Sequence, residues 1–319
     1  MPKIAVAEGD GIGKEVIPVA RRVLEIVRPD LEFFPVEVGY GRWERTGEAI
    51  TSDEIRAMRQ ADAVLFGAVT TPPDPDYRSV VVRMRKELDL YANVRPVRGE
   101  GVDIVIVREN TEGLYAGIEE VGPERATSLR VITRAGSERI ARFACNLAKD
   151  RRHLTIGHKA NVLKADTLFR ETCLRVAGEA GVPVQERFID ALCLDVLQHP
   201  NNYDVIVTEN MFGDILSDVA AYLVGGLGML PSGNIGDRAA LFEPVHGSAP
   251  KHAGKDTANP VAAIRSAAML LAYLGDRENA ARIEEAVTRV IASGIRTRDL
   301  GGLAGTREMG EAVVAALAR

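Results

Sequence analysis

The sequence predicts an α/β fold with a largely parallel sheet. Short apolar runs typical of buried strands alternate with longer segments whose apolar residues recur at helical spacing, almost throughout the chain. No internal repeat, low-complexity tract or linker separates two self-contained halves. Such alternation favours helices that cover both faces of a mostly parallel sheet.

The first elements come in the order strand, tight turn and helix. An apolar run at residues 4–7 leads into the segment GDGIG at residues 9–13, and an amphipathic stretch follows at residues 14–27. A dinucleotide-binding fingerprint of the Rossmann type requires a small residue three places after the second glycine, where the helix packs on the strand. Lys14 occupies that place, so the segment does not fit the fingerprint.

The later elements continue the alternation. Because each is a short apolar run, further strands are predicted at residues 63–66, 102–107, 153–156 and 204–208. Because apolar residues recur three and four apart, helices are predicted at residues 137–149, 165–179, 215–223, 261–274 and 279–293. If the chain has two domains, it must therefore cross between them.

Length and charge narrow the class of protein. The chain has 319 residues, which corresponds to about two domains. Its formal net charge is -5 and no basic run is interleaved with aromatic residues, so a nucleic-acid partner is not expected. The chain enters a strand without a signal-like segment, and its longest apolar stretches, such as residues 219–230, are broken by glycine and too short for a bilayer. We therefore expect a cytoplasmic protein with no membrane partner.

The cysteines do not form a recognisable site. Cys145, Cys173 and Cys193 are odd in number, far apart and without the spacing of metal ligands. We expect them to be buried as small hydrophobic side chains.

A cluster of arginines is the first candidate for a binding site. Arg83, Arg85 and Arg95 are close together in RSVVVRMRKELDLYANVRP, and Arg108 follows in VIVRENTEGLY. Ion pairing to neighbouring acidic residues explains Arg83. Arg95 and Arg108 are expected where a strand meets its loop, at the edge where α/β sheets bind ligands. Since guanidinium groups match carboxylates bidentately, converging arginines would bind a di- or tricarboxylate.

Two aspartates in TENMFGDILSD suggest a metal site. Asp214 and Asp218 are four residues apart, which on a helix places both carboxylates on one face. Their repulsion destabilises the helix slightly unless something offsets it, and a hard cation such as Mg or Mn prefers oxygen ligands of this kind. Asp190, at another predicted strand end, is a candidate third ligand. Solvated carboxylates on an exposed helix remain the alternative.

Further residues are candidates for proton transfer or for nucleotide binding. Lys159 in GHKANVLK follows a strand and is either a surface residue or, if buried beside cations, a group that exchanges a proton near neutrality. Tyr115 is either a core residue or a proton donor. The segment LFEPVHGSAPKHAGKDTANP has small residues that expose backbone amides, and Asn259 stands at the cap of the next helix. This loop is a better candidate for a nucleotide than GDGIG.

Taken together, these stretches resemble a known family. GDGIGKEV, RSVVVRMRKELDLYANVRP, VRENTEGLYAGIE, HKANV, NMFGDILSD, GGLGMLPSGNIGD, FEPVHGSAPKHAGKDTANP and DLGG occur in order across nearly the whole chain. They look like the metal-dependent β-decarboxylating dehydrogenases that act on isocitrate, homoisocitrate, 3-isopropylmalate or tartrate. The resemblance implies an isocitrate/isopropylmalate dehydrogenase-like two-domain fold that is unrelated to the Rossmann domain.

The resemblance also implies a domain organisation and a reaction. Residues 1–94 with 241–319 would form a discontinuous large domain that binds the cofactor. Residues 95–240 would form a small central domain at the interface of a homodimer with shared active sites, and association into a tetramer stays open. The implied reaction is oxidation of a 2-hydroxy di- or tricarboxylic acid by NADP or NAD with loss of carbon dioxide, assisted by Mg or Mn.

Residue roles follow from the matched motifs. Tyr115, Lys159 and Asp190 would be catalytic, with Lys159 and Asp190 serving the partner's site. Substrate would be bound by Ser79, Arg85, Arg95, Arg108 and Asn161, and metal by Asp190, Asp214 and Asp218. Cofactor would be bound by Thr70, His246, Gly247, Ser248, Ala249, Pro250, Lys251, His252, Asn259 and Arg298.

Two other classes of protein fit the chain less well. A non-catalytic regulatory subunit of the same family typically lacks some acidic or basic site residues, whereas all of them are present here. A metal-free 2-hydroxyacid dehydrogenase would leave the aspartate pair and the arginine cluster unexplained.

The substrate is ranked from the residues before Arg85. Ser79 stands where the resembling isocitrate enzymes carry a serine that bonds the γ-carboxylate, but Val81 replaces their asparagine. Residues 80–82 could instead surround an isopropyl group, and Arg83, turned inward, would suit homoisocitrate. We rank isocitrate first, with homoisocitrate and 3-isopropylmalate as alternatives.

The cofactor is ranked from the loop after HGSAP. NAD-using members usually carry an aspartate where this chain has Lys251, and His252 and Arg298 add two donors for a 2′-phosphate. Ala258 resembles the NAD pattern, and solvated loop residues are the alternative. The sequence therefore favours NADP over NAD.

Overall fold

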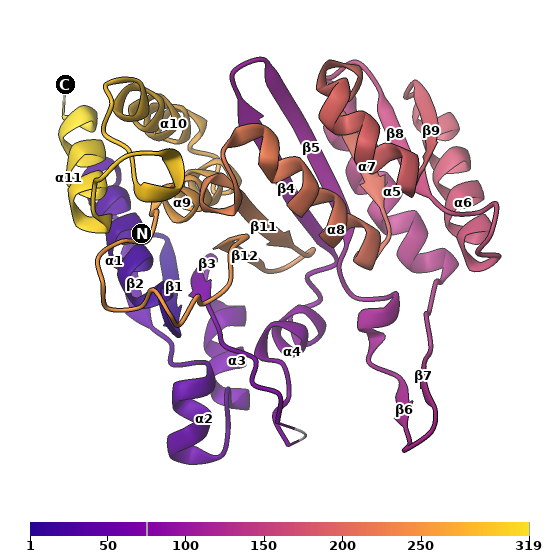
Figure 1. Cartoon of the computed structure of the whole chain (residues 1–319), viewed down its shortest axis with the longest axis horizontal. Coiled ribbons are helices and arrows are strands. Elements are labelled where there is room, and N and C mark those ends of the chain that lie inside the picture. The colour runs from indigo at the N-terminus through magenta and orange to yellow at the C-terminus, as the bar shows by residue number, and fades with distance from the viewer. Residues whose placement is uncertain (75, 319) are drawn as a thin grey trace. The chain divides into compact units, whose positions relative to one another are not determined.

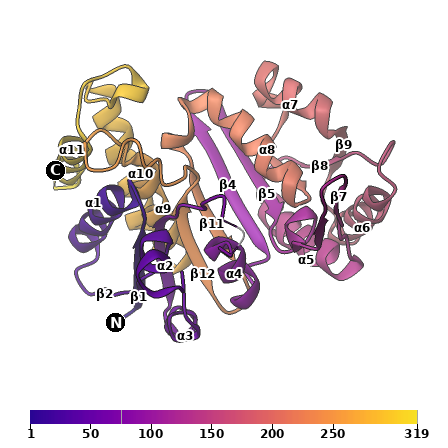
Figure 2. The ribbon, with the colours of Figure 1, turned by 60° about the horizontal axis from the view of Figure 1, so that its bottom comes forward.

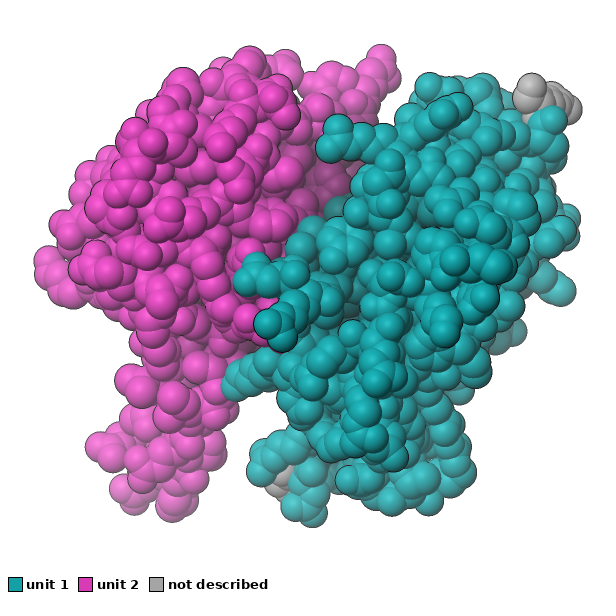
Figure 3. All heavy atoms as spheres, turned by 180° about the vertical axis from the view of Figure 1, so that it is seen from behind, with its two compact units in different colours: residues 1–88, 225–319 teal, residues 89–224 magenta. Residues whose placement is uncertain are grey.

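The computed structural model describes residues 1–74 and 76–318, which form two compact units (Figures 1 and 3). Unit 1 comprises Met1–Leu88 and Gly225–Arg319, and unit 2 comprises Asp89–Val224. The chain enters unit 1, passes into unit 2 and returns, so unit 1 is discontinuous. The domain boundaries and the dimer role expected from the sequence remain predictions.

Unit 1 contains a five-stranded part of the sheet in the order β2-β1-β3-β12-β11. Its strands are β1 (Lys3–Gly9), β2 (Glu32–Pro35), β3 (Ala63–Ala68), β11 (Pro231–Ile235) and β12 (Ala240–Pro244). Neighbours run parallel except β11 and β12, which are antiparallel. Every residue of β3 is buried, as expected for a parallel strand covered on both faces.

The helices of unit 1 are α1 (Gly13–Val27), α2 (Tyr40–Thr46), α3 (Ser52–Gln60), α4 (Val80–Glu87), α9 (Val261–Tyr273), α10 (Arg277–Ala292) and α11 (Thr306–Leu317). Short 3-10 turns lie at Leu227–Met229 and Arg298–Leu300. Figure 1 shows α1, α9 and α11 side by side, and α1 contacts both of the others. Helix α9 is buried along almost its whole length and packs on β11 and β12, which explains why its sequence is apolar all round.

Unit 2 contains strands in the order β4-β5-β10-β8-β9. These are β4 (Ala92–Gly99), β5 (Val102–Glu109), β8 (Leu154–His158), β9 (Val184–Phe188) and β10 (Val205–Thr208), and β6 (Glu119–Val121) with β7 (Ala126–Ser128) forms a separate two-stranded sheet. Strands β5, β10, β8 and β9 are parallel, whereas β4 is antiparallel to β5. The first residues of β4 therefore lie beside the carboxyl end of β5.

The helices of unit 2 are α5 (Arg134–Ala148), α6 (Ala165–Ala180), α7 (Ile189–Gln198) and α8 (Asn210–Ala221). Short 3-10 turns lie at Leu114–Ala116, Pro200–Asn202 and Tyr222–Val224. Helices α5 and α6 pack on each other, as do α7 and α8 (Figure 2). Among the described residues, no helix is both long enough and apolar enough to cross a membrane.

Two expectations require correction. Arg95 does not stand where a strand meets its loop: it lies within β4, because Pro96 is accommodated in the strand and pairs in register with Val105 of β5. Cys145 and Cys173 are buried as predicted, but Cys193 is only half-buried because it lies on α7, much of which is exposed.

Candidate active site

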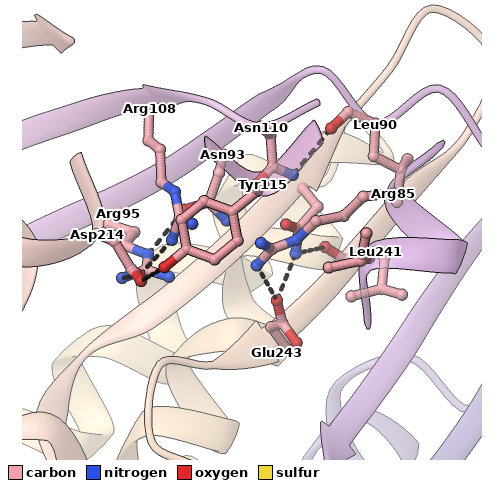
Figure 4. Close-up of polar contacts among 12 residues, drawn as sticks. Arg85, Leu90, Asn93, Arg95, Arg108, Asn110, Tyr115, Asp214, Leu241 and Glu243 are labelled. Atoms are coloured by element: carbon pink, nitrogen blue, oxygen red, sulfur yellow. Dashed lines mark hydrogen bonds and ion pairs between the residues drawn. The ribbon is translucent and has the colours of Figure 1, made fainter. Parts of the chain in front are cut away.

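A carboxylate surrounded by cationic and phenolic groups marks the candidate site in unit 2. Arg108 and Arg95 both contact the carboxylate of Asp214: Arg108 Nη1 donates to Oδ1, and Arg95 Nη1 lies 3.2 Å from the same oxygen. The Tyr115 hydroxyl donates to Asp214 Oδ2 at 2.8 Å (Figure 4). The phenol ring also lies against the Arg108 guanidinium, 5.1 Å from its carbon.

Two elements bring these residues together. Arg108 lies near the carboxyl end of β5, and the antiparallel pairing of β4 with β5 places Arg95 close to it. Helix α8 approaches β5 closely because residue 213 is glycine: a Cβ there would lie only 2.7 Å from the Cβ of Arg108. Asp214 is the next residue, so it reaches both guanidinium groups.

Asp218 lies one turn further along α8. Its carboxylate is 3.7 Å from Arg95 Nη1, and burial raises its pKa, opposed by the positive charge of Arg95. The repulsion expected between Asp214 and Asp218 is therefore offset in the protein itself by Arg95 and Arg108. A metal ion is therefore not required to compensate the negative charge of Asp214 and Asp218, although it could add to the compensation by the two arginines.

Neighbouring polar residues hold the arginines in place. Asn210 Oδ1 accepts from Arg108 Nε at 2.9 Å and from Nη2 at 2.7 Å. Arg95 donates to Asn93 Oδ1 at 2.7 Å and to Ser217 Oγ at 2.6 Å. These partners were not predicted from the sequence. Their motifs contain them, but a single asparagine or serine has no pattern that announces its role.

Lys159 and Asp190 form a second pair in unit 2. Lys159 Nζ lies 2.5 Å from Asp190 Oδ1, and this hydrogen bond lowers the pKa of the aspartate. Asp166, which is fully buried, accepts from the backbone amide of Lys159 at 2.6 Å. Asn161 is exposed two residues further on. The backbone amide of Lys159 is therefore held in place, the Asp190 side chain is exposed and the Lys159 side chain is partly buried.

The other residues predicted to bind substrate lie in unit 1. Arg85 Nη2 is 3.6 Å from Glu243 Oε1, and both side chains are nearly buried (Figure 4). Ser79 is the N-cap of α4, where its hydroxyl accepts from the amide of Val82. Arg83 donates to Glu87 at 2.6 Å and to the carbonyl of Ile50 at 2.7 Å, so the ion pair expected for it is present. Thus two of the three arginines expected to converge share Asp214, while Arg85 belongs to the other unit.

The candidate cofactor loop in unit 1 is partly buried. The Thr70 hydroxyl lies 2.8 Å from the Ser248 hydroxyl, and Ser248 is 6% exposed. Asn259 donates to Asp299 at 2.9 Å and accepts from the amide of Val261, but the N-cap of α9 is Pro260, so Asn259 lies one residue before the cap expected for it. His246 and Gly247 precede Ser248, Ala249 and Pro250 follow it, and Lys251, His252 and Arg298 are exposed.

The residues present suit a nicotinamide cofactor. His246 Nε2 is buried and has no hydrogen-bond partner among the described residues, and burial lowers the pKa of this imidazole. A buried ring nitrogen without a partner is costly, so a bound group that completes its hydrogen bonding fits this position.

The donor set also suits a metal in part. Asp214 and Asp218 supply carboxylate oxygens, the ligand type preferred by Mg and Mn. Within residues 1–74 and 76–318, however, no three acidic, histidine or cysteine side chains come together as metal ligands. One chain therefore offers two of the three expected ligands, and Asp190 does not join them within it.

Comparisons with known proteins show the family of the chain. Residues 3–313 match the family described as isocitrate/isopropylmalate dehydrogenase. The chain is 50% identical to an isocitrate/homoisocitrate dehydrogenase of Thermus thermophilus, covering 99% of this chain and 98% of the relative, and 48% identical to a 3-isopropylmalate/3-methylmalate dehydrogenase of Methanocaldococcus jannaschii, covering 98% of each. A crystal structure of isocitrate dehydrogenase from Methylococcus capsulatus matches all of both chains at 41% identity and a TM-score of 0.96. The chain therefore belongs to the isocitrate/isopropylmalate dehydrogenase family, whose members are decarboxylating oxidoreductases.

Proposed function

We propose that the protein oxidises and decarboxylates isocitrate to 2-oxoglutarate with NADP as hydride acceptor, as a homodimer that uses Mg or Mn. The observation that carries the proposal is the grouping of Arg95, Arg108 and Tyr115 around Asp214. Two guanidinium groups can bind substrate carboxylates, and a phenol can deliver a proton. A binding protein that only recognised the acid would not need the phenol.

The proton transfers are assigned to two groups. Lys159, paired with Asp190, takes the proton of the substrate hydroxyl as hydride leaves C2 for the nicotinamide. The β-keto acid then loses carbon dioxide, and Tyr115 donates a proton to C3. Arg95 and Arg108 hold carboxylates throughout and, being buried, are pre-organised to do so.

The proposed metal ligands are Asp214 and Asp218, completed by Asp190 of the partner subunit. A bound Mg or Mn ion would supply positive charge for the developing enolate and lower the barrier to hydroxyl deprotonation. The division of ligands between subunits is supported by the absence of a third ligand within the described part of one chain.

A dimer is further supported by apolar side chains that unit 2 exposes to solvent. Phe188 precedes α7, Leu194 lies on it, Ile215 lies on α8 and Tyr222 follows it; they are 44%, 58%, 51% and 80% exposed. Exposed large apolar residues on two neighbouring helices favour burial against a partner. Association beyond the dimer stays open.

Three features support isocitrate. Ser79 keeps the register of the serine in the resembling isocitrate enzymes. Arg83, the residue that would suit homoisocitrate, is bound to Glu87 and Ile50 within unit 1. Val80, which could face an isopropyl group, is 1% exposed in the same unit. Homoisocitrate and 3-isopropylmalate remain the alternatives, since relatives of similar identity carry names that include them.

A substrate panel tests the proposal. Isocitrate, homoisocitrate and 3-isopropylmalate are compared by kcat/KM with NADP and with NAD, while carbon dioxide release is measured with and without a metal chelator. We expect the highest kcat/KM for isocitrate with NADP. With chelator, we expect neither reduced cofactor nor carbon dioxide to form. A higher value for another acid would overturn the substrate assignment, activity that survives the chelator would overturn the metal, and no turnover of any acid would indicate a non-catalytic subunit.

A further inference from the structure

Four backbone amides of the glycine-rich turn between β1 and α1 are already bonded within the protein. The amides of Asp10, Ile12, Gly13 and Lys14 all donate to backbone carbonyls. Ile12 N donates to the carbonyl oxygen of Ser248 at 2.8 Å. Gly11 permits this contact, because it has φ +58° and a Cβ there would lie 2.0 Å from the same oxygen. The turn therefore rests directly on the candidate cofactor loop.

A buried carboxylate in the turn collects three backbone amides. Asp10 is 7% exposed, and its Oδ2 accepts from Tyr40 N at 2.7 Å and from Thr70 N at 2.9 Å, while Oδ1 accepts from Gly41 N at 3.0 Å. Thr70 is the residue whose hydroxyl contacts Ser248 Oγ. Asp10 therefore holds Thr70 in place, and Thr70 in turn contacts Ser248 near the start of the candidate cofactor loop.

A second carboxylate, five residues later, holds the other end of the loop. Glu15 lies in the first turn of α1, and its Oε1 accepts from Gly254 N at 2.7 Å while Oε2 accepts from Asp256 N at 3.0 Å. Asp256 has φ +54°, an unfavourable conformation for a non-glycine residue that needs support from outside. The loop at residues 246–256 is thus fastened near both ends by the same turn.

We propose that Asp10 and Glu15 are positioning residues for the cofactor. Each carboxylate orders backbone amides of the loop or of Thr70, so that the side chains of the loop are held in place before the cofactor arrives, and neither carboxylate touches it. This inference rests on the proposed function, because it takes residues 246–256 as the nicotinamide cofactor site. It gives GDGIGKE a role distinct from phosphate binding, and pre-organisation of this kind lowers the entropic cost of binding.

The test uses the full-length variants Asp10→Asn and Glu15→Gln. An amide keeps the size of each carboxylate, but its NH2 group must face a backbone N–H that the lost oxygen had bonded, which leaves at least one donor unsatisfied. Titration with NADPH and with NADH, followed by the fluorescence of the bound nicotinamide, should show that the Kd rises about tenfold in either variant. At saturating cofactor, kcat and the KM for the acid substrate should stay within about twofold of the parent.

Two further variants make the result decisive. Asp204→Asn alters a buried carboxylate of unit 2 that accepts the amide of Arg152 at 2.6 Å, and it should lower the melting temperature without changing the cofactor Kd. Asn259→Ala removes a residue assigned to the cofactor site itself. If Asn259→Ala weakens cofactor binding while Asp10→Asn and Glu15→Gln do not, the positioning role is wrong and the site stands. If none of the three changes the Kd, the proposed cofactor site is wrong.

Should Asp10→Asn fold poorly, Glu15→Gln carries the test, because Glu15 is only partly buried. Hydrogen exchange gives an independent measurement: in Glu15→Gln the amides of residues 246–256 should exchange faster, with no change in β5 or β10. Unchanged exchange in the loop would overturn the inference, and faster exchange there together with weaker cofactor binding would support it.

Discussion

Asp214 has two cationic neighbours and one phenol, and this environment decides what each residue can do. Arg108 is 1% exposed, and a guanidinium so buried requires a counter-charge, which Asp214 supplies. The same carboxylate accepts from Tyr115, so it orients the phenol that we assign to protonation of C3. Asp214 therefore contacts both a guanidinium group that we assign to substrate binding and the phenol that we assign to proton transfer.

Tyr115→Phe and Lys159→Ala should each lose overall turnover while still binding the acid and Mn. A proton-transfer residue typically contributes about 100- to 10,000-fold, so steady-state rates should fall within that range. Tyr115→Phe should still reduce added keto acid, because its deficit lies after hydride transfer. Tyr203→Phe, which removes a buried hydroxyl bonded to Asp195 instead, is the control. Either catalytic variant keeping more than half of the parent turnover would contradict its role.

Ser79→Ala should reduce kcat/KM for isocitrate far more than for 3-isopropylmalate. A hydroxyl that bonds a carboxylate discriminates by about 1.5 to 3 kcal/mol. Because Ser79 also caps α4, the variant loses stability as well, and Ser79→Thr should restore the cap. The measurement is the ratio of kcat/KM for the two acids. Equal losses on both acids would show that only the cap matters.

Lys251→Asp should raise the KM for NADP more than tenfold and leave or improve the use of NAD. Lys251 is exposed and free to donate to a 2′-phosphate, and a charged hydrogen bond contributes about 1.5 to 3 kcal/mol. Lys251→Met separates the two effects: it should weaken NADP without improving NAD. A parent enzyme with higher kcat/KM for NAD than for NADP would refute this interpretation of the loop.

At the scale of elements, periodicity predicts strands β1, β3, β5, β8 and β10 and several long helices, but it misses the buried strands β11 and β12 and places some beginnings poorly. The helix expected at residues 261–274 is Val261–Tyr273, whereas the one expected from residue 215 begins at Asn210. NMFGD has no apolar period, and the helix starts where the Glu209 side chain accepts from Phe212 N. For strand β4 the sequence predicts only a strand end at Arg95 and no bounds, because its arginines and proline are not an apolar run and its burial comes from tertiary packing.

The same distinction holds for the candidate site. Repeated or oddly spaced charges, such as Arg95 and Asp214, could be identified from the sequence. Asp166, in the first turn of α6, and Asp10, in the turn before α1, could not, because a single carboxylate at such a position looks solvated until the fold brings backbone amides to it. The resemblance to a family predicted more than residue spacing did, because a family's motifs reflect its three-dimensional structure, whereas the spacing of residues in one sequence does not.

An ion-pair cluster between α1 and α10 should make stability depend on acidity. Arg28 follows α1 and bonds both Asp30 and Asp276, the latter being the N-cap of α10. Its hydrogen bonds lower the pKa of Asp30 to about 2, and for Asp276 the bonds from Asn279 and Arg28 outweigh burial and lower the pKa. Because both folded values are depressed, this stabilisation is complete above the unfolded pKa of about 4 and is lost as pH falls towards 2.

Arg28→Gln should therefore lower the melting temperature at pH 6 and flatten its fall between pH 5 and pH 3. Arg22→Gln is the matched control, because Arg22 lies on α1, shortly before Arg28, and its contact with Glu25, at 3.7 Å, is exposed. Melting curves of the three proteins across this pH range give the comparison. A parallel fall in all three would show that other carboxylates dominate acid unfolding.

At the scale of the whole molecule, the proposed active site is divided between two subunits. Asp214 and Tyr115 would act within their own chain, whereas Lys159 and Asp190 would act in the partner's site. The described residues contain Lys159 paired with Asp190 and, separately, Tyr115 bonded to Asp214. In a two-fold symmetric dimer each subunit would then donate the same residues to the other.

A mixture of two inactive variants should therefore recover activity. In a hybrid dimer of Lys159→Ala with Asp214→Asn, one site carries both defects and the other carries neither, so each hybrid should have about half of the parent turnover. After unfolding and refolding of an equal mixture, random pairing makes about half of the dimers hybrid and gives about a quarter of the parent activity. Each variant refolded alone is the control and should stay inactive. If the site were built within one chain, every site in the mixture would keep one defect, and no activity would return.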